Sequence, residues 1–153
     1  MERRKVSERA RLPRWLKLAN PVIVALQRRG VVIGTMRLLC VRGRESGKLR
    51  TTPVSPLMVE GERYIIAGLD EADWVKNARV AGWGILARGR EQERVNLVEL
   101  PLQERAPVLR EFPSKVPHGV QFFQHLYGIS GSPEEFEALG SRCPVFRVEE
   151  TGP

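Results

Sequence analysis

The residues best placed to do chemistry lie in the sequence RGRESGKLRTTP, residues 42–53. This segment places four cationic side chains among two glycines and three hydroxyl side chains. Gly43 and Gly47 allow positive φ, so their backbone N–H groups could converge on one set of anionic oxygens. Arginine side chains pair with phosphate oxygens through two parallel hydrogen bonds. The segment therefore predicts a turn between two strands that binds a phosphate group.

The spacing differs from the phosphate-binding loop of nucleoside triphosphatases, which reads G-x-x-x-x-G-K-[ST]. Only three residues separate Gly43 from Gly47, and Leu49 stands where that loop has a metal-binding hydroxyl. The chain from Arg50 onward has the pattern of a strand, whereas a helix follows the phosphate-binding loop. These differences argue against a nucleoside triphosphatase.

Other catalytic and metal-binding patterns are missing from the sequence. It contains no HExxH, GxGxxG or GxSxG, which gives no support to a zinc protease, a dinucleotide-binding fold or a serine hydrolase. His118 and His125 stand seven residues apart with no cysteine or carboxylate at ligand spacing, so we expect no metal site. Cys40 and Cys143 are too few for a disulfide framework, and we expect both to be reduced.

Composition and charge indicate a globular protein with anionic partners. The chain has 153 residues, which suit one domain, and 42% of them are hydrophobic and 28% charged. The formal net charge of +7 does not select among nucleic acid, acidic lipid and phosphorylated small molecules. The apolar stretch at 21–33 is interrupted by the sequence QRRG, so no transmembrane helix is predicted. With no apolar signal segment at the N-terminus, we expect a cytoplasmic protein.

Two regions are predicted, a basic extension over residues 1–19 and a folded domain over residues 20–150. The extension carries seven basic residues, Arg3, Arg4, Lys5, Arg9, Arg11, Arg14 and Lys17. With Trp15 and Leu16 beside them, these residues could contact anionic lipid. The protein could then sit peripherally at a membrane surface.

The folded domain must hold the 42–53 segment between strands. Strand patterns occur at 36–43, 51–69 and 143–150, and hairpins are predicted at 59–66, with Gly61 in the turn, and at 83–100 around a charged turn. Hairpins imply an antiparallel sheet. About six short strands in a chain of this size suit a small barrel flanked by short helices, an α+β fold.

Helical patterns occur in four segments, at 21–29, 70–82, 101–112 and 132–141. We expect Asp70 to cap the second helix and Gly82 to end it. In the last segment, Ser132 precedes two acidic residues of a first turn, the pattern of a capped helix.

Several of these residues, in this order, resemble the deazaflavin-dependent nitroreductase family. The family pattern G-R-x-[ST]-G-x-x-R-x-x-P-L is followed by a hairpin and by a helix containing W-x-x-N. The positions of this chain that match are Gly43, Arg44, Ser46, Gly47, Arg50, Pro53, Trp74 and Asn77. The resemblance covers residues 20–100 well and continues more loosely to the last strand. It implies a split β-barrel of the FMN-binding type that binds the reduced deazaflavin coenzyme F420.

The resemblance also implies roles for individual residues. The phosphate of the coenzyme would lie on the 42–50 loop, the deazaflavin ring along the strand at 51–54, and the following strand end and the W-x-x-N helix would flank both. The cofactor-binding residues implied in this way are Arg44, Ser46, Gly47, Lys48, Arg50, Thr51, Thr52, Pro53, Val54, Ala67, Gly68, Trp74 and Asn77. The reaction implied is hydride transfer to a quinone-like, nitro or other electron-poor organic acceptor.

The chain departs from the family pattern at three places. Glu45 stands where many relatives have a basic residue, and Lys48 is the nearest compensating charge. No tyrosine follows Pro53, although relatives active on nitro compounds often have one there. Asp70 and Glu71 make the loop before the W-x-x-N helix acidic, and they would repel a polyglutamate tail if they pointed toward it. FMN therefore stays open as an alternative cofactor.

A second hypothesis is a binding module without turnover, which holds a phosphate-bearing ligand or nucleic acid. Residues 42–56 contain no aromatic side chain, which disfavours nucleic acid, because binding to single strands relies on base stacking. For the enzyme hypothesis, Tyr127 is a weak catalytic candidate that could supply a phenol to the acceptor, although packing explains it better. Split barrels of this size often pair, so a homodimer is also open.

Overall fold

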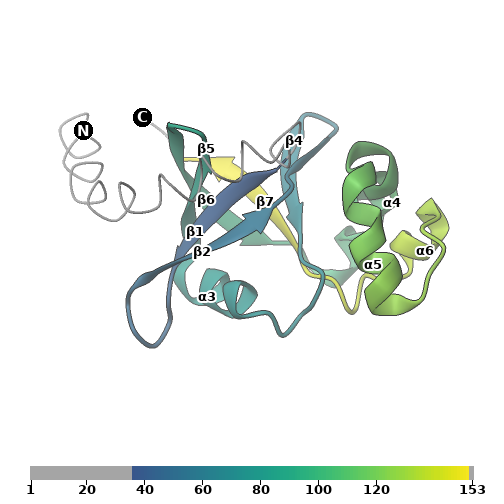
Figure 1. Cartoon of the computed structure of the whole chain (residues 1–153), viewed down its shortest axis with the longest axis horizontal. Coiled ribbons are helices and arrows are strands. Elements are labelled where there is room, and N and C mark those ends of the chain that lie inside the picture. Colours follow the sequence, from purple (N-terminus) through teal and green to yellow (C-terminus); the bar gives the residue numbers. More distant parts are fainter. Residues whose placement is uncertain (1–35, 152–153) are drawn as a thin grey trace.

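The computed structural model describes residues 36–151. In this part of the chain, seven strands form one antiparallel sheet in the order β2-β1-β5-β6-β7-β4-β3. The sheet curls into an open half-barrel (Figure 1). The strands are β1 (Arg37–Arg42), β2 (Leu49–Val54), β3 (Leu57–Val59), β4 (Glu62–Ile66), β5 (Trp83–Arg88), β6 (Glu91–Glu99) and β7 (Val145–Glu150). The predicted α+β fold with a split antiparallel barrel is thus confirmed.

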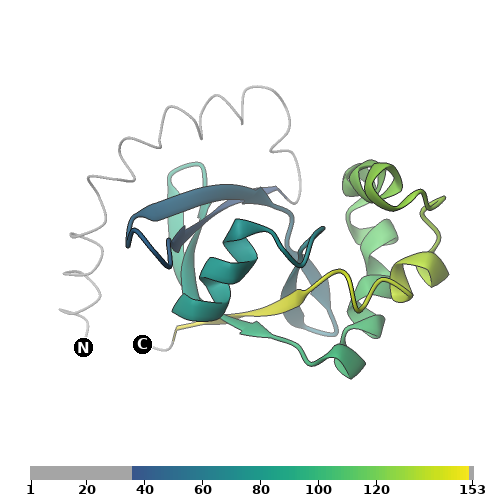
Figure 2. The same ribbon diagram turned by 90° about the horizontal axis from the view of Figure 1, so that it is seen from below.

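Four short helices accompany the sheet in the described residues. They are α3 (Asp73–Ala81), α4 (Ala106–Lys115), α5 (Val120–Tyr127) and α6 (Pro133–Glu137), with single 3-10 turns at η1 (Leu102–Glu104) and η2 (Pro117–Gly119). Seen from below, α3 lies across the open end of the curled sheet, while α4, α5 and α6 gather on one side of it (Figure 2).

The inside of the barrel is filled by alternate residues of the strands, because successive side chains of a strand point to opposite faces. Val75 and Ala78 on α3 pack into the same core, which explains why this helix closes the barrel end. The buried strand residues of this core are Leu39, Val41, Val54, Ile65, Leu86, Val95, Leu97, Phe146 and Val148.

A second hydrophobic core lies between the sheet and the helices α4, α5 and α6. Three aromatic rings, Phe112, Phe123 and Phe136, pack on one another with centroids 5.0–5.2 Å apart. Val145 on β7 belongs to this core, whereas its neighbour Phe146 belongs to the barrel core. The strand β7 therefore packs against both cores through its two faces.

The predicted hairpins are confirmed. Glu60 and Gly61 connect β3 to β4 with φ of 51° and 81°, a turn that favours glycine because both positions are left-handed. The hairpin of β5 and β6 turns at Gly89. The last strand, predicted at 143–150, begins at Val145.

The boundaries of three helices, α3, α4 and α6, differ from the predictions, and α5 was not among the predicted helical segments. Helix α3 begins at Asp73 with Ala72 as its N-cap, so the prediction of Asp70 as the cap is wrong. The segment at 101–112 is divided, because a 3-10 turn follows Pro101 and α4 starts only at Ala106. The end of α3 at Gly82, with φ of 75°, is confirmed.

The cap at Ser132 is confirmed, but α6 ends at Glu137 and not near residue 140 as predicted. The Ser132 hydroxyl accepts the Glu135 N–H, and the Glu135 carboxylate accepts the Ser132 N–H in return. The predicted helix at 21–29 and the boundary between residues 19 and 20 lie outside the described residues. Within residues 36–151, no helix is long and apolar enough to cross a membrane.

Candidate functional site

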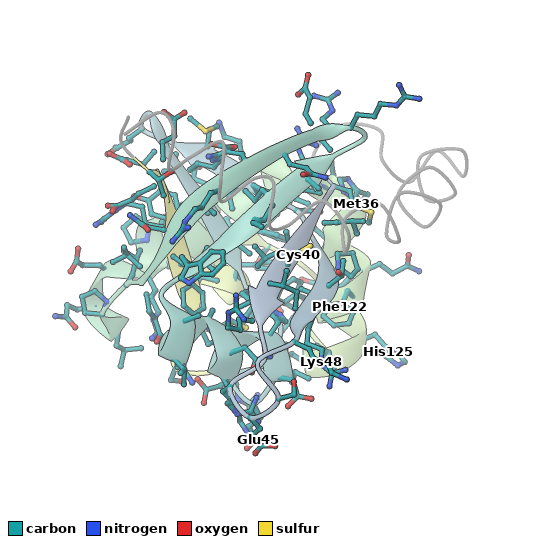
Figure 3. The ribbon with its side chains drawn as sticks, turned by 90° about the vertical axis from the view of Figure 1, so that its left-hand side faces the viewer. Met36, Cys40, Glu45, Lys48, Phe122 and His125 are labelled. Atoms are coloured by element: carbon teal, nitrogen blue, oxygen red, sulfur yellow. The ribbon has the colours of Figure 1, made fainter. Side chains whose placement is uncertain are left out.

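A cleft of about 500 Å³ opens between the loop that joins β1 to β2, the strand β2 and the first turns of α3. Figure 3 shows the loop extending beyond the sheet, with Glu45 at its outer end. The cleft is lined by Val41, Gly43, Arg44, Glu45, Ser46, Arg50, Thr51, Thr52, Asp73, Trp74 and Asn77.

The loop, residues 43–48, is held by its own backbone. The Gly43 N–H donates to the Lys48 carbonyl at 2.7 Å, and the Gly47 N–H donates to the Gly43 carbonyl at 3.0 Å. Gly47 has φ of 74°, a conformation that suits glycine. A Cβ on Gly43 would lie 2.9 Å from the Ser46 Oγ and 3.2 Å from the Lys48 carbonyl. Close packing therefore favours glycine at this position.

These bonds correct one expectation about the loop. The N–H groups of Gly43 and Gly47 do not converge on an anion, because both donate to carbonyls of the loop. The Lys48 N–H is also used, since it donates to the Ser46 Oγ at 3.2 Å. These three N–H groups are therefore not available to an anion at this loop.

Arg44 connects the loop to α3 through Asn77. The Asn77 Oδ1 accepts both the Arg44 backbone N–H, at 3.0 Å, and the Arg44 Nη1, at 2.8 Å. Asn77 is only 4% exposed, so this double contact is shielded from water and fixes the direction of the guanidinium. The Arg44 Nη2 lies 3.4 Å from the Asp73 Oδ1.

Trp74 lies between the cleft and the barrel core. Its ring centroid is 5.5 Å from that of Phe146, and the side chain packs on the barrel core while it lines the cleft. Helix α3 therefore contributes an apolar wall as well as the polar groups of Asp73 and Asn77.

Strand β2 forms the opposite wall and is an edge of the sheet. It contributes Arg50, Thr51 and Thr52 to the lining. Arg50 and Thr52 share one face of the strand, and Thr51 lies on the other face, where its hydroxyl meets Cys40. The Thr51 Oγ1 lies 3.5 Å from the Cys40 Sγ. Burial raises the pKa of the Cys40 thiol, and the hydrogen bond with Thr51 offsets part of that rise, so Cys40 is a neutral core residue near pH 7.

The structure brings together seven of the residues implied as cofactor-binding. Arg44, Ser46, Arg50, Thr51, Thr52, Trp74 and Asn77 all line the cleft. Gly47, Lys48, Pro53 and Val54 belong to the same loop and strand but do not line it. Ala67 and Gly68, after β4, do not line it either.

Gly68 instead contacts the helical side of the protein. The Tyr127 hydroxyl donates to the Gly68 carbonyl, and the Cys143 thiol lies 3.7 Å from the same oxygen. A Cβ on Gly68 would collide with the Phe122 ring. Tyr127 therefore has a structural contact here, and it does not line the cleft.

Four lining residues, Val41, Gly43, Glu45 and Asp73, were not among the cofactor-binding residues implied from the sequence. Gly43 and Glu45 belong to the 42–53 segment itself. Asp73 stands four positions before Asn77, and residues at this spacing share one face of a helix. That spacing was the available signal for Asp73. Nothing in the sequence marked Val41 as a site residue, since an apolar residue in a strand is expected to pack in the core.

The two carboxylates expected to repel a polyglutamate tail, Asp70 and Glu71, do not line the cleft. Asp70 pairs with Arg79 at 2.7 Å and has its pKa lowered, first by this hydrogen bond, so this carboxylate is already neutralised. No group of three or more histidine, cysteine, aspartate or glutamate side chains that could hold a metal ion occurs within residues 36–151.

No protein-family model matches the chain, and no curated protein matches its sequence. Solved structures do match. An F420-H2 dependent reductase, FDR-A, is 21% identical, with a TM-score of 0.50 over 75% of this chain and 94% of the other. A nimC/nimA family protein from Clostridium acetobutylicum is 14% identical, with a TM-score of 0.50 over 74% of this chain and 73% of the other.

A third match, the protein Atu2129 of unknown function from Agrobacterium tumefaciens, is 12% identical with a TM-score of 0.54 over 80% of this chain. The chain spans about half the length, 51%, of that protein. At these identities the matches establish the fold, which is split-barrel-like.

Proposed function

We propose that the protein is an oxidoreductase that binds a phosphate-bearing deazaflavin, coenzyme F420 in its reduced form, in the cleft between β2 and α3. The observation that carries the proposal is the contact between Arg44 and Asn77. It joins the two separate halves of the family pattern in one cleft, although Arg44 and Asn77 are 33 positions apart in the chain.

The donor set fits a phosphate-bearing ring system. Arg44, Arg50 and Ser46 would hold the phosphate, since two guanidinium groups and a hydroxyl suit its oxygens. The ring would lie along β2 against Trp74. Because β2 is an edge strand of the described sheet, its outer backbone groups are open to the polar edge of a ring.

The chemistry divides between cofactor and protein. When bound, a reduced deazaflavin supplies a hydride to an electron-poor organic acceptor, here proposed to be quinone-like or nitro-substituted. The residues of the chain bind and orient: Asn77 fixes the Arg44 guanidinium, and Trp74 excludes water from one wall of the cleft. Positioning of this kind accounts for a large share of rate enhancement in bimolecular reactions.

The test is a fluorescence titration of the purified protein with coenzyme F420 and, in parallel, with FMN. We expect micromolar or tighter binding of the deazaflavin. Arg50→Ala should weaken it by at least about tenfold, the effect of one charge-assisted hydrogen bond. The matched control is Arg90→Ala, which removes the same charge from the exposed turn between β5 and β6 and should leave the affinity unchanged.

Each other outcome has a defined meaning. Tight binding of FMN alone would keep the cleft but assign the protein to FMN-dependent reductases. Equal loss of affinity in both arginine variants would contradict the site, because it would reflect the overall charge. Binding of neither cofactor would refute the proposal and favour a module that binds another phosphate-bearing ligand or nucleic acid.

A further inference from the structure

Asp73 is a carboxylate that lines the cleft and also lies in the first turn of α3, where the helix dipole favours a negative charge. Its side chain is 88% exposed, and its contact with Arg44 is long, at 3.4 Å. Exposed ion pairs of this kind contribute about 0–1 kcal/mol at most. Asn77 already fixes Arg44 through two shorter hydrogen bonds, so the position of Arg44 does not depend on Asp73.

The charge of the cleft differs from that of the protein. The whole chain has a formal net charge of +7. The charged residues that line the cleft are Arg44, Arg50, Glu45 and Asp73, two positive and two negative, so the lining carries no net charge. A phosphate bound at Arg44 would lie beside the Asp73 carboxylate, because both would contact the same guanidinium.

We propose that Asp73, together with Glu45, makes the cleft selective for a ligand with a single phosphate group and against one whose phosphate carries further carboxylates. This inference rests on the proposed function, whose ligand site it refines. One phosphate group would pair with the guanidinium groups of both Arg44 and Arg50. Each additional negative group near the two carboxylates meets like charge, and at roughly 8 Å in a partly aqueous cleft one such pair weakens binding by about fivefold.

The test compares two forms of the deazaflavin coenzyme, one whose phosphate carries no glutamate and one with a polyglutamate tail. Their dissociation constants are measured by fluorescence for wild type, Asp73→Asn and Glu71→Gln. We expect the wild type to prefer the form without glutamate, and Asp73→Asn to reduce this preference about fivefold. Glu71→Gln removes the same charge from a residue outside the lining and should keep the preference.

The salt dependence of the preference between the two coenzyme forms separates an electrostatic role of Asp73 from a structural one. A purely structural role would leave the preference independent of salt. Raising the ionic strength to about 0.5 M should reduce the preference of the wild type, since added salt screens exposed charges. In the double variant Glu45→Gln with Asp73→Asn, the ratio of the two dissociation constants should change much less with salt.

Two results would overturn the inference while the proposed function stands. One is a wild type that binds the polyglutamate form as tightly as the other. The second is a preference that Asp73→Asn and Glu71→Gln reduce equally. Failure of both coenzyme forms to bind the wild type would instead refute the proposed function, and the selectivity with it.

Discussion

At the scale of single residues, Asn77 holds the cleft together. Its buried Oδ1 accepts two hydrogen bonds from Arg44. Asn77→Ala removes the acceptor from both donors and leaves space in a buried site. We expect the free energy of unfolding to fall by about 1–3 kcal/mol, the usual effect of unsatisfied buried donors. Urea denaturation followed by circular dichroism measures this change.

Asp73→Asn is the control for this experiment, because it changes the other contact of Arg44 at an exposed position. It should alter the free energy of unfolding by no more than about 0.5 kcal/mol. If both variants lose the same stability, the contact with Asn77 has no special role and our account of the loop is wrong.

At the same scale, the sequence predicted which kinds of residue line the cleft better than it predicted which residues contact one another. Arg44, Arg50 and the hydroxyl residues of the 42–53 segment line one cleft, because short turns and strands bring near neighbours together, but the cations Arg42 and Lys48 do not line it. The contact of Asp70 with Arg79 could not be predicted, since it depends on how the loop before α3 folds back. The packing of Gly68 against Phe122 joins segments that only the tertiary fold brings together.

At the scale of elements, Tyr127 fastens α5 to the end of β4. Its hydroxyl donates to the Gly68 carbonyl, and burial first of all raises its pKa to about 12. Burial likewise raises the pKa of the nearby Cys143 thiol to about 11. Both groups are favoured in their neutral forms by folding. Their contribution to stability is therefore complete below the unfolded pKa values, near 9 for cysteine and 10 for tyrosine, and is lost as pH rises toward 12.

We therefore expect the urea midpoint of the wild type to fall between pH 9 and pH 12. Tyr127→Phe should be less stable than the wild type at pH 7, by about 1 kcal/mol for the lost hydrogen bond. The difference between the two proteins should shrink as pH rises above 10. A difference that stays constant up to the alkaline limit of the measurement would show that the Tyr127 proton is not held by Gly68.

The sequence indicated most of these elements because each has a local cause. Gly61 and Ser132 are examples, since the first supports a tight left-handed turn and the second caps α6 with its own side chain. The start of α3 could not be located in this way. Ala72 makes no side-chain cap, so packing of Val75 and Ala78 in the barrel decides where the helix begins.

At the scale of the whole molecule, strand β7 connects two cores. It pairs with both β6 and β4, so the last strand of the chain completes a sheet begun much earlier. The barrel with hairpins was predictable from local patterns. The insertion of β7 between β6 and β4 was not, because pairing of distant strands leaves no local signature.

Because β7 contributes to both cores, we expect the two cores to unfold as one cooperative unit. Phe136 lies at the centre of the helical core and is 0% exposed. Phe136→Ala should lower the free energy of unfolding by about 3–5 kcal/mol, because it removes a buried ring and leaves a cavity. Phe136→Leu, a smaller change, should have a weaker effect in the same direction. Val80→Ala, at a side chain 69% exposed on α3, is the surface control.

The prediction specific to this fold is that two spectroscopic probes of unfolding give the same result for Phe136→Ala. Trp74 and Trp83 report on the barrel by fluorescence, in a background where Trp15 is replaced by phenylalanine, and far-ultraviolet circular dichroism reports on the helices. Because Val145 and Phe146 couple the cores through adjacent residues of β7, both probes should shift to the same lower urea midpoint. If the circular dichroism transition shifts while the fluorescence transition stays, the helical core unfolds alone, and the barrel that bears the cleft does not depend on it.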